Sequence, residues 1–138
     1  MEDLQKQGLK NDCNCEPDKV LLFPCSGGSN VGQLSNAAAV KLTEEGKGRL
    51  FCLAGLGGHI PHMIETVKGA ERIVAIDGCS VACSKLTLEH AGFKVTDYLL
   101  LTEEGIKKNK DFNLREAEIN NICEKVLNKL SQEVSSSS

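Results

Sequence analysis

Apolar runs alternate with helical patterns along this chain, and the alternation restricts the fold more than any other feature of the sequence. Four apolar runs are each short enough to form a buried strand, and they span 20–23, 50–53, 72–76 and 95–101. Helical patterns follow them, and these span 31–46, 61–68, 80–92 and 114–130. Apolar strands separated by helices are typical of a parallel sheet covered on both faces. We predict a small three-layer α/β sandwich, Rossmann-like or flavodoxin-like, with a mainly parallel four-stranded sheet in an order that the pattern does not fix.

The chain has 138 residues, which suits one domain with its own hydrophobic core. Residues 1–18 are polar and lack periodicity, and we expect a mobile N-terminal arm. Residues 19–131 are expected to form the single α/β domain, and the Ser-rich segment 132–138 a disordered tail. Ser29 or Asn30 is a suitable N-cap for the first long helix, and Gly46 is a suitable residue just after its end.

Composition disfavours two classes of partner. A net charge of −3, four Phe, one Tyr and no Trp provide neither a basic patch nor a stacking surface for nucleic acid. No apolar stretch reaches the length of a membrane span, and the N-terminus lacks the apolar region of a signal peptide. We therefore expect a cytoplasmic protein, where thiols stay reduced. Seven cysteines in that compartment indicate metal binding or thiol chemistry rather than disulfides.

Four cysteines are predicted to meet at one edge of the sheet. Cys25, Cys52 and Cys79 each come at the carboxyl end of an apolar run, and Cys83 follows in the first turn of the next helix. Ligand sites of open parallel sheets lie beyond these strand ends. If Cys79 and Cys83 are both helical, their spacing of four places them on one helix face. We interpret the four as a single thiolate site at the carboxyl edge, with four sulfurs for zinc.

Several other residues have two readings. His59 and His62 follow a Gly-rich loop and are either further ligands or a general base, or incidental residues at the start of a surface helix. The glycine-rich turn 24–30 resembles an anion cradle but equally suits a tight connection from strand to helix. Asp77 either orients a ligand or holds the Asp-Gly turn.

The remaining cysteines are expected to stand apart from the site. Cys13 and Cys15 lie in the arm and are as well explained by chance as by metal binding. Cys123 falls on an amphipathic helix, where packing is the better interpretation.

Four ordered segments resemble the DGC-domain family, small prokaryotic proteins named for an Asp-Gly-Cys motif. The segments are PCSGGSNVGQLSNAAAVKL, CLAGLGG, IVAIDGCSVACSKLTLEHAG and LTEEGIKK, and they cover roughly residues 20–110. The resemblance implies a zinc site formed by the cysteines of the first three segments, namely Cys25, Cys52, Cys79 and Cys83. It implies no established reaction.

Three functions therefore remain at this point. The first is a metal-binding protein that holds a thiophilic ion, most simply zinc, although four cysteines also suffice for an iron–sulfur cluster. The second is a cysteine-dependent thiol, redox or sulfur-transfer enzyme that uses the same cysteines. The third is an interaction module in which zinc only ties loops together, which is the least natural because the domain has its own core. The sequence names no protein partner, and whether the protein is an enzyme stays open.

Overall fold

The sheet at the centre of the protein is parallel throughout. The structure, a computed structural model, describes residues 17–132. A 3-10 turn, η1 (Pro17–Lys19), leads into the first strand. The strands are β1 (Val20–Pro24), β2 (Arg49–Leu50), β3 (Arg72–Asp77) and β4 (Asp97–Leu100), arranged in the order β2-β1-β3-β4. This confirms the predicted fold class and supplies the strand order that periodicity left open.

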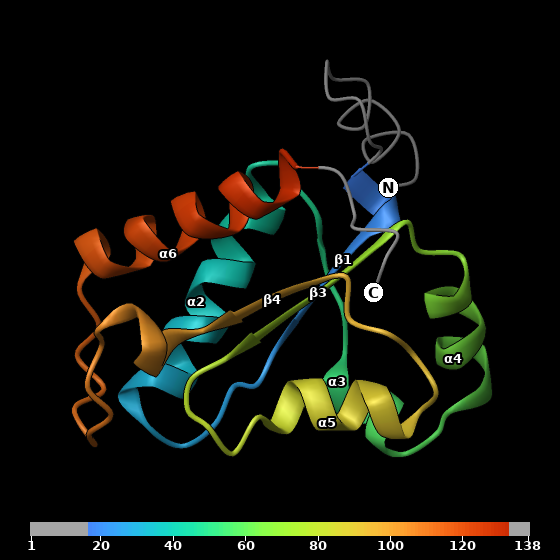
Figure 1. The fold of residues 1–138 in the computed structure, drawn as a ribbon, viewed down its shortest axis with the longest axis horizontal. Helices are drawn as coiled ribbons and strands as arrows, with labels where there is room; N and C mark the ends of the chain where they lie inside the picture. The colour runs from blue at the N-terminus through green and yellow to red at the C-terminus, as the bar shows by residue number, and fades with distance from the viewer. Residues whose placement is uncertain (1–16, 133–138) are drawn as a thin grey trace.

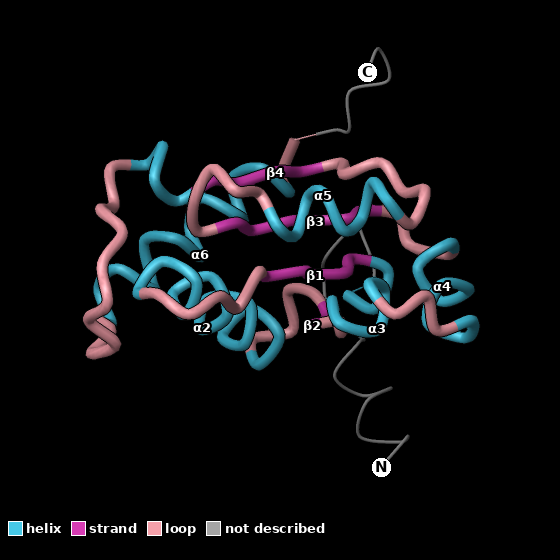
Figure 2. Tube along the Cα trace, turned by 90° about the horizontal axis from the view of Figure 1, so that it is seen from below, coloured by secondary structure: helices cyan, strands magenta, loops and turns pink. Residues whose placement is uncertain are grey.

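Helices cover both faces of the sheet. α2 (Asn30–Glu44) and α6 (Glu116–Leu130) lie on one face, whereas α3 (Leu53–Gly57), α4 (Pro61–Lys68) and α5 (Cys83–His90) lie on the other (Figures 1 and 2). A second 3-10 turn, η2 (Leu101–Glu104), follows β4. The two helical layers and the sheet form the predicted three-layer arrangement.

The alternation of β1 side chains divides the core into two clusters. Val20 and Leu22 pack toward α2 and α6, and Leu21 and Phe23 pack toward α3, α4 and α5. All four side chains are almost completely buried, as expected for a central strand of a sheet covered on both sides. β1 is therefore fixed in position from both faces, and so is the loop that leaves its carboxyl end.

An ion pair fastens α6 to the sheet. The guanidinium of Arg72 donates to both carboxylate oxygens of Asp97, at 3.0 and 2.8 Å, and both side chains are buried. The same guanidinium donates to the backbone oxygens of Lys129 and Leu130 in the last turn of α6. Arg72 thus satisfies carbonyl groups that a helix end leaves without partners.

Two predicted elements differ in the structure. The second strand ends at Leu50, not Leu53, and the segment expected as a loop forms the short helix α3. The apolar residues of this segment are buried by packing against α5 and its neighbours rather than by strand pairing. The helix after β3 begins at Cys83 rather than near Ser80, because residues 78–82 form a turn. The helix of residues 30–44 agrees with its prediction, with Ser29 as N-cap and Gly46 in the left-handed region.

Most of the predicted arm and tail lies outside the described residues. Within 17–132, no helix is both long enough and apolar enough to cross a membrane.

Candidate functional site

The strand order places a crevice between β1 and β3. The chain runs from β1 through α2 to β2 at one edge, and then returns past β1 to β3 and β4. The connections that leave β1 and β3 therefore go to opposite faces, as Figure 1 shows for α2 and α5. Parallel sheets of this kind bind ligands outside the strand ends where the order reverses. Here that position is occupied by the segments 25–29 and 78–82.

Cys25 is held at this crevice by the backbone. It directly follows β1, and its N–H donates to the backbone oxygen of Ile76 at 3.0 Å, which extends the pairing with β3 by one residue. The next residue, Ser26, has a positive φ of 54°, so the chain turns sharply toward α2. The half-buried Sγ of Cys25 accepts a hydrogen bond from the N–H of Gly78 at 3.4 Å. This thiol therefore faces the turn that contains Cys79.

The Asp-Gly-Cys turn lies directly against the start of α2. A Cβ atom at Gly78 would stand 2.7 Å from the backbone carbonyl carbon of Val31 and 2.8 Å from the nitrogen of Gly32. Atoms cannot approach that closely without displacement, so only glycine fits here. The close approach brings the loops after β1 and β3 together.

Cys79 and Cys83 do not share a helix face, contrary to prediction. Cys79 lies in a turn closed by a hydrogen bond from the N–H of Ala82 to its carbonyl oxygen, at 3.0 Å. Ala82 adopts a left-handed conformation with φ 60°, and α5 begins one residue later. Cys79 is half-buried, and Cys83, the first residue of α5, is exposed. Both still border the crevice, but from a turn and a helix start.

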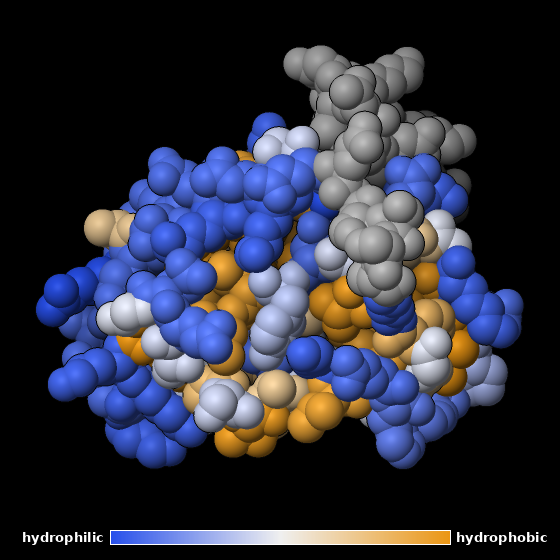
Figure 3. Space-filling view, viewed as in Figure 1, coloured by the Kyte–Doolittle hydropathy of each residue, from blue (hydrophilic) through white to orange (hydrophobic). Residues whose placement is uncertain are grey.

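Three of the four predicted cysteines line one cavity. Cys25, Cys79 and Cys83 border a space of about 380 Å³ beside the glycine-rich turn. The exposed side chain of Val81 forms part of the rim, and Figure 3 shows apolar atoms near the start of α5. These three thiols therefore border the same cavity.

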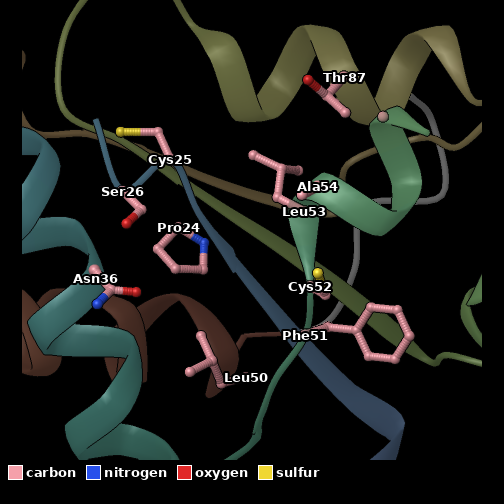
Figure 4. A pocket seen from close by; sticks show the side chains of 11 residues that line it. Pro24, Cys25, Ser26, Asn36, Leu50, Phe51, Cys52, Leu53, Ala54 and Thr87 are labelled. Carbon is pink, nitrogen blue, oxygen red and sulfur yellow. The ribbon is translucent and has the colours of Figure 1, made fainter. Parts of the chain in front are cut away.

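Cys52 lies apart from this group. It is the N-cap of α3, and its Sγ accepts a hydrogen bond from the N–H of Gly55 at 3.3 Å. It borders a second cavity of about 630 Å³, which it shares with Cys25 but not with Cys79 or Cys83. Figure 4 shows the sulfur of Cys25 pointing away from Cys52. Cys25 thus stands between the two cavities.

The donor atoms suit a thiophilic metal, but they are not gathered around one point. Among residues 17–132, no group of three or more His, Cys, Asp or Glu side chains is close enough together to hold a metal ion. Thiolates are nevertheless the ligands that zinc prefers in structural sites. The residues fit such an ion by their chemistry, and their side chains must turn toward one another to bind it.

Asp77 fixes the start of α5. Its carboxylate, which is only 1% exposed, accepts hydrogen bonds from the N–H groups of Ser84 at 2.8 Å and Lys85 at 3.1 Å. The hydroxyl of Tyr98 donates to the same carboxylate at 3.0 Å. Of its two predicted roles, Asp77 therefore holds the turn, and it also supplies the N-terminal cap that Ala82 lacks.

The buried network changes two pKa values. Burial, followed by the charge of Asp77 and its hydrogen bond, raises the pKa of Tyr98. Burial, followed by the charges of Asp77, Cys25 and Cys79, raises the pKa of the Cys83 thiol. Ionised thiols that lie close together repel one another, and a bound cation would relieve such repulsion.

Two lysines at the thiol cavity were missed by sequence reasoning. Lys108 and Lys110, in the segment between η2 and α6, line the cavity. The ammonium of Lys108 lies 3.5 Å from the Sγ of Cys79, and that of Lys110 donates to the backbone oxygen of Gly28 at 2.8 Å. The available signal was the basic run 107–110 after the fourth strand, at the same edge of the sheet as the cysteines.

Asn30 holds this segment in place. Its side-chain amide donates to the backbone oxygen of Lys107 at 2.8 Å and accepts from the N–H of Asn109 at 2.6 Å. Its own N–H donates to the backbone oxygen of Asn109 at 2.9 Å. We call residues 105–115 the basic strap, because three hydrogen bonds to Asn30 fasten it over the start of α2.

The histidines do not border the thiol cavity. His59 has a positive φ of 57° and makes an edge-to-face contact with His90 at the end of α5, with ring centroids 5.3 Å apart. His62 lies in the first turn of α4, and all three rings are exposed. This placement favours the surface interpretation of these residues over a role as ligand or base.

The remaining cysteines divide between the core and the undescribed arm. Cys123 is 5% exposed between α2 and α6, which confirms its expected packing role, and burial raises its pKa. Cys13 and Cys15 lie outside the described residues.

Comparisons with known proteins agree with this arrangement of motifs. No solved structure matches the chain. A protein of Pseudomonas aeruginosa, the anaerobic and virulence modulator AnvM, is 36% identical over 100 residues, which cover 71% of this chain and 76% of that protein. The DGC domain matches residues 21–126, which contain the thiol cavity, Cys52 and the basic strap. The chain belongs to the DGC-domain family.

Proposed function

We propose that this protein binds a thiophilic metal ion, with zinc as the first choice, through Cys25, Cys79, Cys83 and Cys52. One observation carries the proposal: three thiols from the two loops at the switch point of the sheet line a single cavity. Membership of the DGC-domain family is consistent with metal binding. Bound zinc would contribute a positive charge that the negative thiolates neutralise, and it would link the loops after β1 and β3.

Each cysteine has a distinct position relative to such an ion. Cys25 is fixed by strand pairing, whereas Cys79 and Cys83 lie on either side of a turn. Cys52 must approach from the neighbouring cavity to complete a set of four, and its exposed position at the start of the five-residue helix α3 makes it the least constrained member. The proposed site therefore has three cysteines that border one cavity and a fourth, Cys52, that must move to reach the ion.

Metal analysis of the purified protein tests the proposal directly. Protein prepared without oxygen should be colourless and contain one zinc per chain, whereas brown protein with iron and sulfide would replace zinc by an iron–sulfur cluster. Replacement of Cys25, Cys79 or Cys83 by Ser should abolish stoichiometric zinc, and Cys123→Ser should not. Full zinc content in all three site variants would overturn the proposal.

The Cys52→Ser variant separates a four-cysteine site from a three-cysteine site. If Cys52 is recruited, zinc affinity falls as sharply as in the other variants. If the fourth position is filled by solvent, the affinity of Cys52→Ser matches that of the unmodified protein, and the ligand set reduces to three.

A thiol enzyme is the second candidate, favoured by the contact between Lys108 and Cys79. An ammonium group beside a sulfur stabilises the thiolate, which is the reactive form of cysteine. Alkylation followed by mass spectrometry distinguishes the two functions. Uniform protection of the three thiols by one equivalent of zinc supports metal binding, and one fast cysteine whose rate ignores zinc supports thiol chemistry.

A further inference from the structure

The thiol cavity is lined by positively charged side chains, which binding of a metal cation does not require. Among the described residues that line it, two are lysines, Lys108 and Lys110, and none is Asp or Glu. The nearest carboxylate of the turn, Asp77, is buried behind the cavity with its oxygens engaged by α5 and Tyr98. Positive charge therefore faces the cavity without a carboxylate on its wall to neutralise it.

Both lysines are exposed, and the fold holds the segment that carries them beside the cavity. The hydrogen bonds of Asn30 to the backbone of Lys107 and Asn109 fix the strap on either side of Lys108. Lys110 is anchored by one of its three N–H donors to the oxygen of Gly28, which leaves two donors for a ligand. Buried Asn30 thus holds the backbone that carries the two lysines beside the cavity.

The glycine-rich turn contributes backbone groups to the same cavity. Within the described chain, the N–H groups of Gly27 and Gly28 make no hydrogen bond, and both residues line the cavity. A Cβ atom at either glycine would meet no atom within 4 Å, so this wall is open. α2, fifteen residues long, begins immediately after this turn and adds the positive end of its dipole.

We propose that this cavity binds a small, doubly charged oxyanion of the phosphate or sulfate class beside the thiols. The ammonium groups of Lys108 and Lys110 and the amides of the glycine-rich turn are its donors. A volume of about 380 Å³ accommodates such an ion together with water. Its neighbours would be the thiols of Cys25, Cys79 and Cys83, so the anion site and the thiols form one compartment. The proposal goes beyond metal binding and does not depend on it.

The test compares two alkylating reagents of nearly equal size on metal-free, reduced protein. Iodoacetate is an anion and iodoacetamide is neutral, and the ratio of their rates at one cysteine cancels the thiolate fraction of that cysteine. At low ionic strength, two unit charges about 6 Å from the reagent should raise this ratio about tenfold at Cys79. Cys52, which borders the other cavity, is the internal reference.

The lysines are then replaced in pairs. Lys108→Gln with Lys110→Gln should lower the ratio at Cys79 to that at Cys52. The control, Lys47→Gln with Lys94→Gln, removes the same charge from two other exposed positions and should leave the ratio unchanged. Urea denaturation of both double variants confirms that they fold alike.

Competition by inorganic phosphate distinguishes a specific anion site from a general attraction of anions by the two lysines. Inorganic phosphate should slow the reaction of Cys79 with iodoacetate in a saturable way, beyond the effect of sodium chloride at equal ionic strength. An unchanged ratio in the Lys108, Lys110 variant would overturn the proposal. Equal slowing by phosphate and chloride would overturn it too, because it would leave only screening. Since the protein is metal-free throughout, neither result bears on zinc binding.

Discussion

Replacement of Asp77 by Asn tests whether one buried carboxylate organises the site. Asn has nearly the same shape but only one acceptor oxygen, whereas the carboxylate accepts from Ser84, Lys85 and Tyr98 through two oxygens. Whichever way the amide is turned, its NH₂ group faces an N–H of α5. One hydrogen bond to a charged group is lost, worth about 1.5–3 kcal/mol, and the dipole of α5 loses an anion, worth about 0.3–1 kcal/mol.

The expected loss of stability is therefore about 2–4 kcal/mol, a large share of the total stability of an ordinary domain. Urea denaturation followed by circular dichroism should show the midpoint lowered by about 1–2 M. Tyr98→Phe, which removes one donor and keeps the carboxylate, is the matched control and should cost less.

The chain contains a single tyrosine and no tryptophan, so absorbance at 295 nm follows Tyr98 alone. Its pKa is raised in the folded protein, first by burial and then by Asp77. The hydroxyl therefore contributes stability that is fully present below the unfolded pKa of about 10 and is lost as pH rises above it. Asp77→Asn should lower the titration midpoint while burial keeps it above 10. An unchanged urea midpoint together with an unchanged tyrosine titration would refute the reasoning.

Three further substitutions have defined outcomes. Gly78→Ala places a Cβ atom 2.7 Å from the backbone of α2 and should lower the free energy of unfolding by about 1–3 kcal/mol. It should also weaken zinc binding, measured by competition with a chelator. The control Gly69→Ala, whose Cβ atom meets its nearest atom at 3.7 Å, should change neither quantity. Cys123→Ser puts a more polar hydroxyl into the apolar core between α2 and α6, where the backbone oxygen of Ala38 still accepts its hydrogen bond, so stability in urea should fall by only about 1 kcal/mol. Loss of zinc from this variant would contradict its structural role. Arg72→Met leaves the buried carboxylate of Asp97 without its cation and should lower the free energy of unfolding by about 3–5 kcal/mol. If the ion pair is the cause, adding Asp97→Asn to this variant should restore part of the lost stability.

The central part of the fold was predictable because its sequence signals are local. β1 and β3 are continuous apolar runs buried on both faces, and each ends at a residue that turns the chain. The helix of residues 30–44 has both its cap residue and its terminal glycine in the sequence. These elements place Cys25 and Cys79 beside the crevice between β1 and β3, as their positions after the apolar runs indicated.

The rest depended on contacts between distant residues. The apolar run 50–53 is compatible with a longer strand, but β2 ends at Leu50 and α3 begins at Leu53, where it packs against α5. Cys52 therefore caps α3 and lies outside the predicted group. The strap is placed by hydrogen bonds from Asn30 to residues almost eighty positions later. No periodicity reports such a contact, so Lys108 and Lys110 could not be placed at the cavity beforehand.

The fastening of the strap by Asn30 has a consequence for how the site can vary. Cys25 and Cys79 lie in turns that the sheet and the close approach at Gly78 hold in place, whereas the lysines belong to an exposed segment tied to Asn30 and Gly28. The positions of the sulfur atoms and the positive charge beside them are thus determined by separate parts of the chain. Substitutions in the strap would change which charged ligands the thiol cavity attracts, while the positions of the sulfur atoms stay the same.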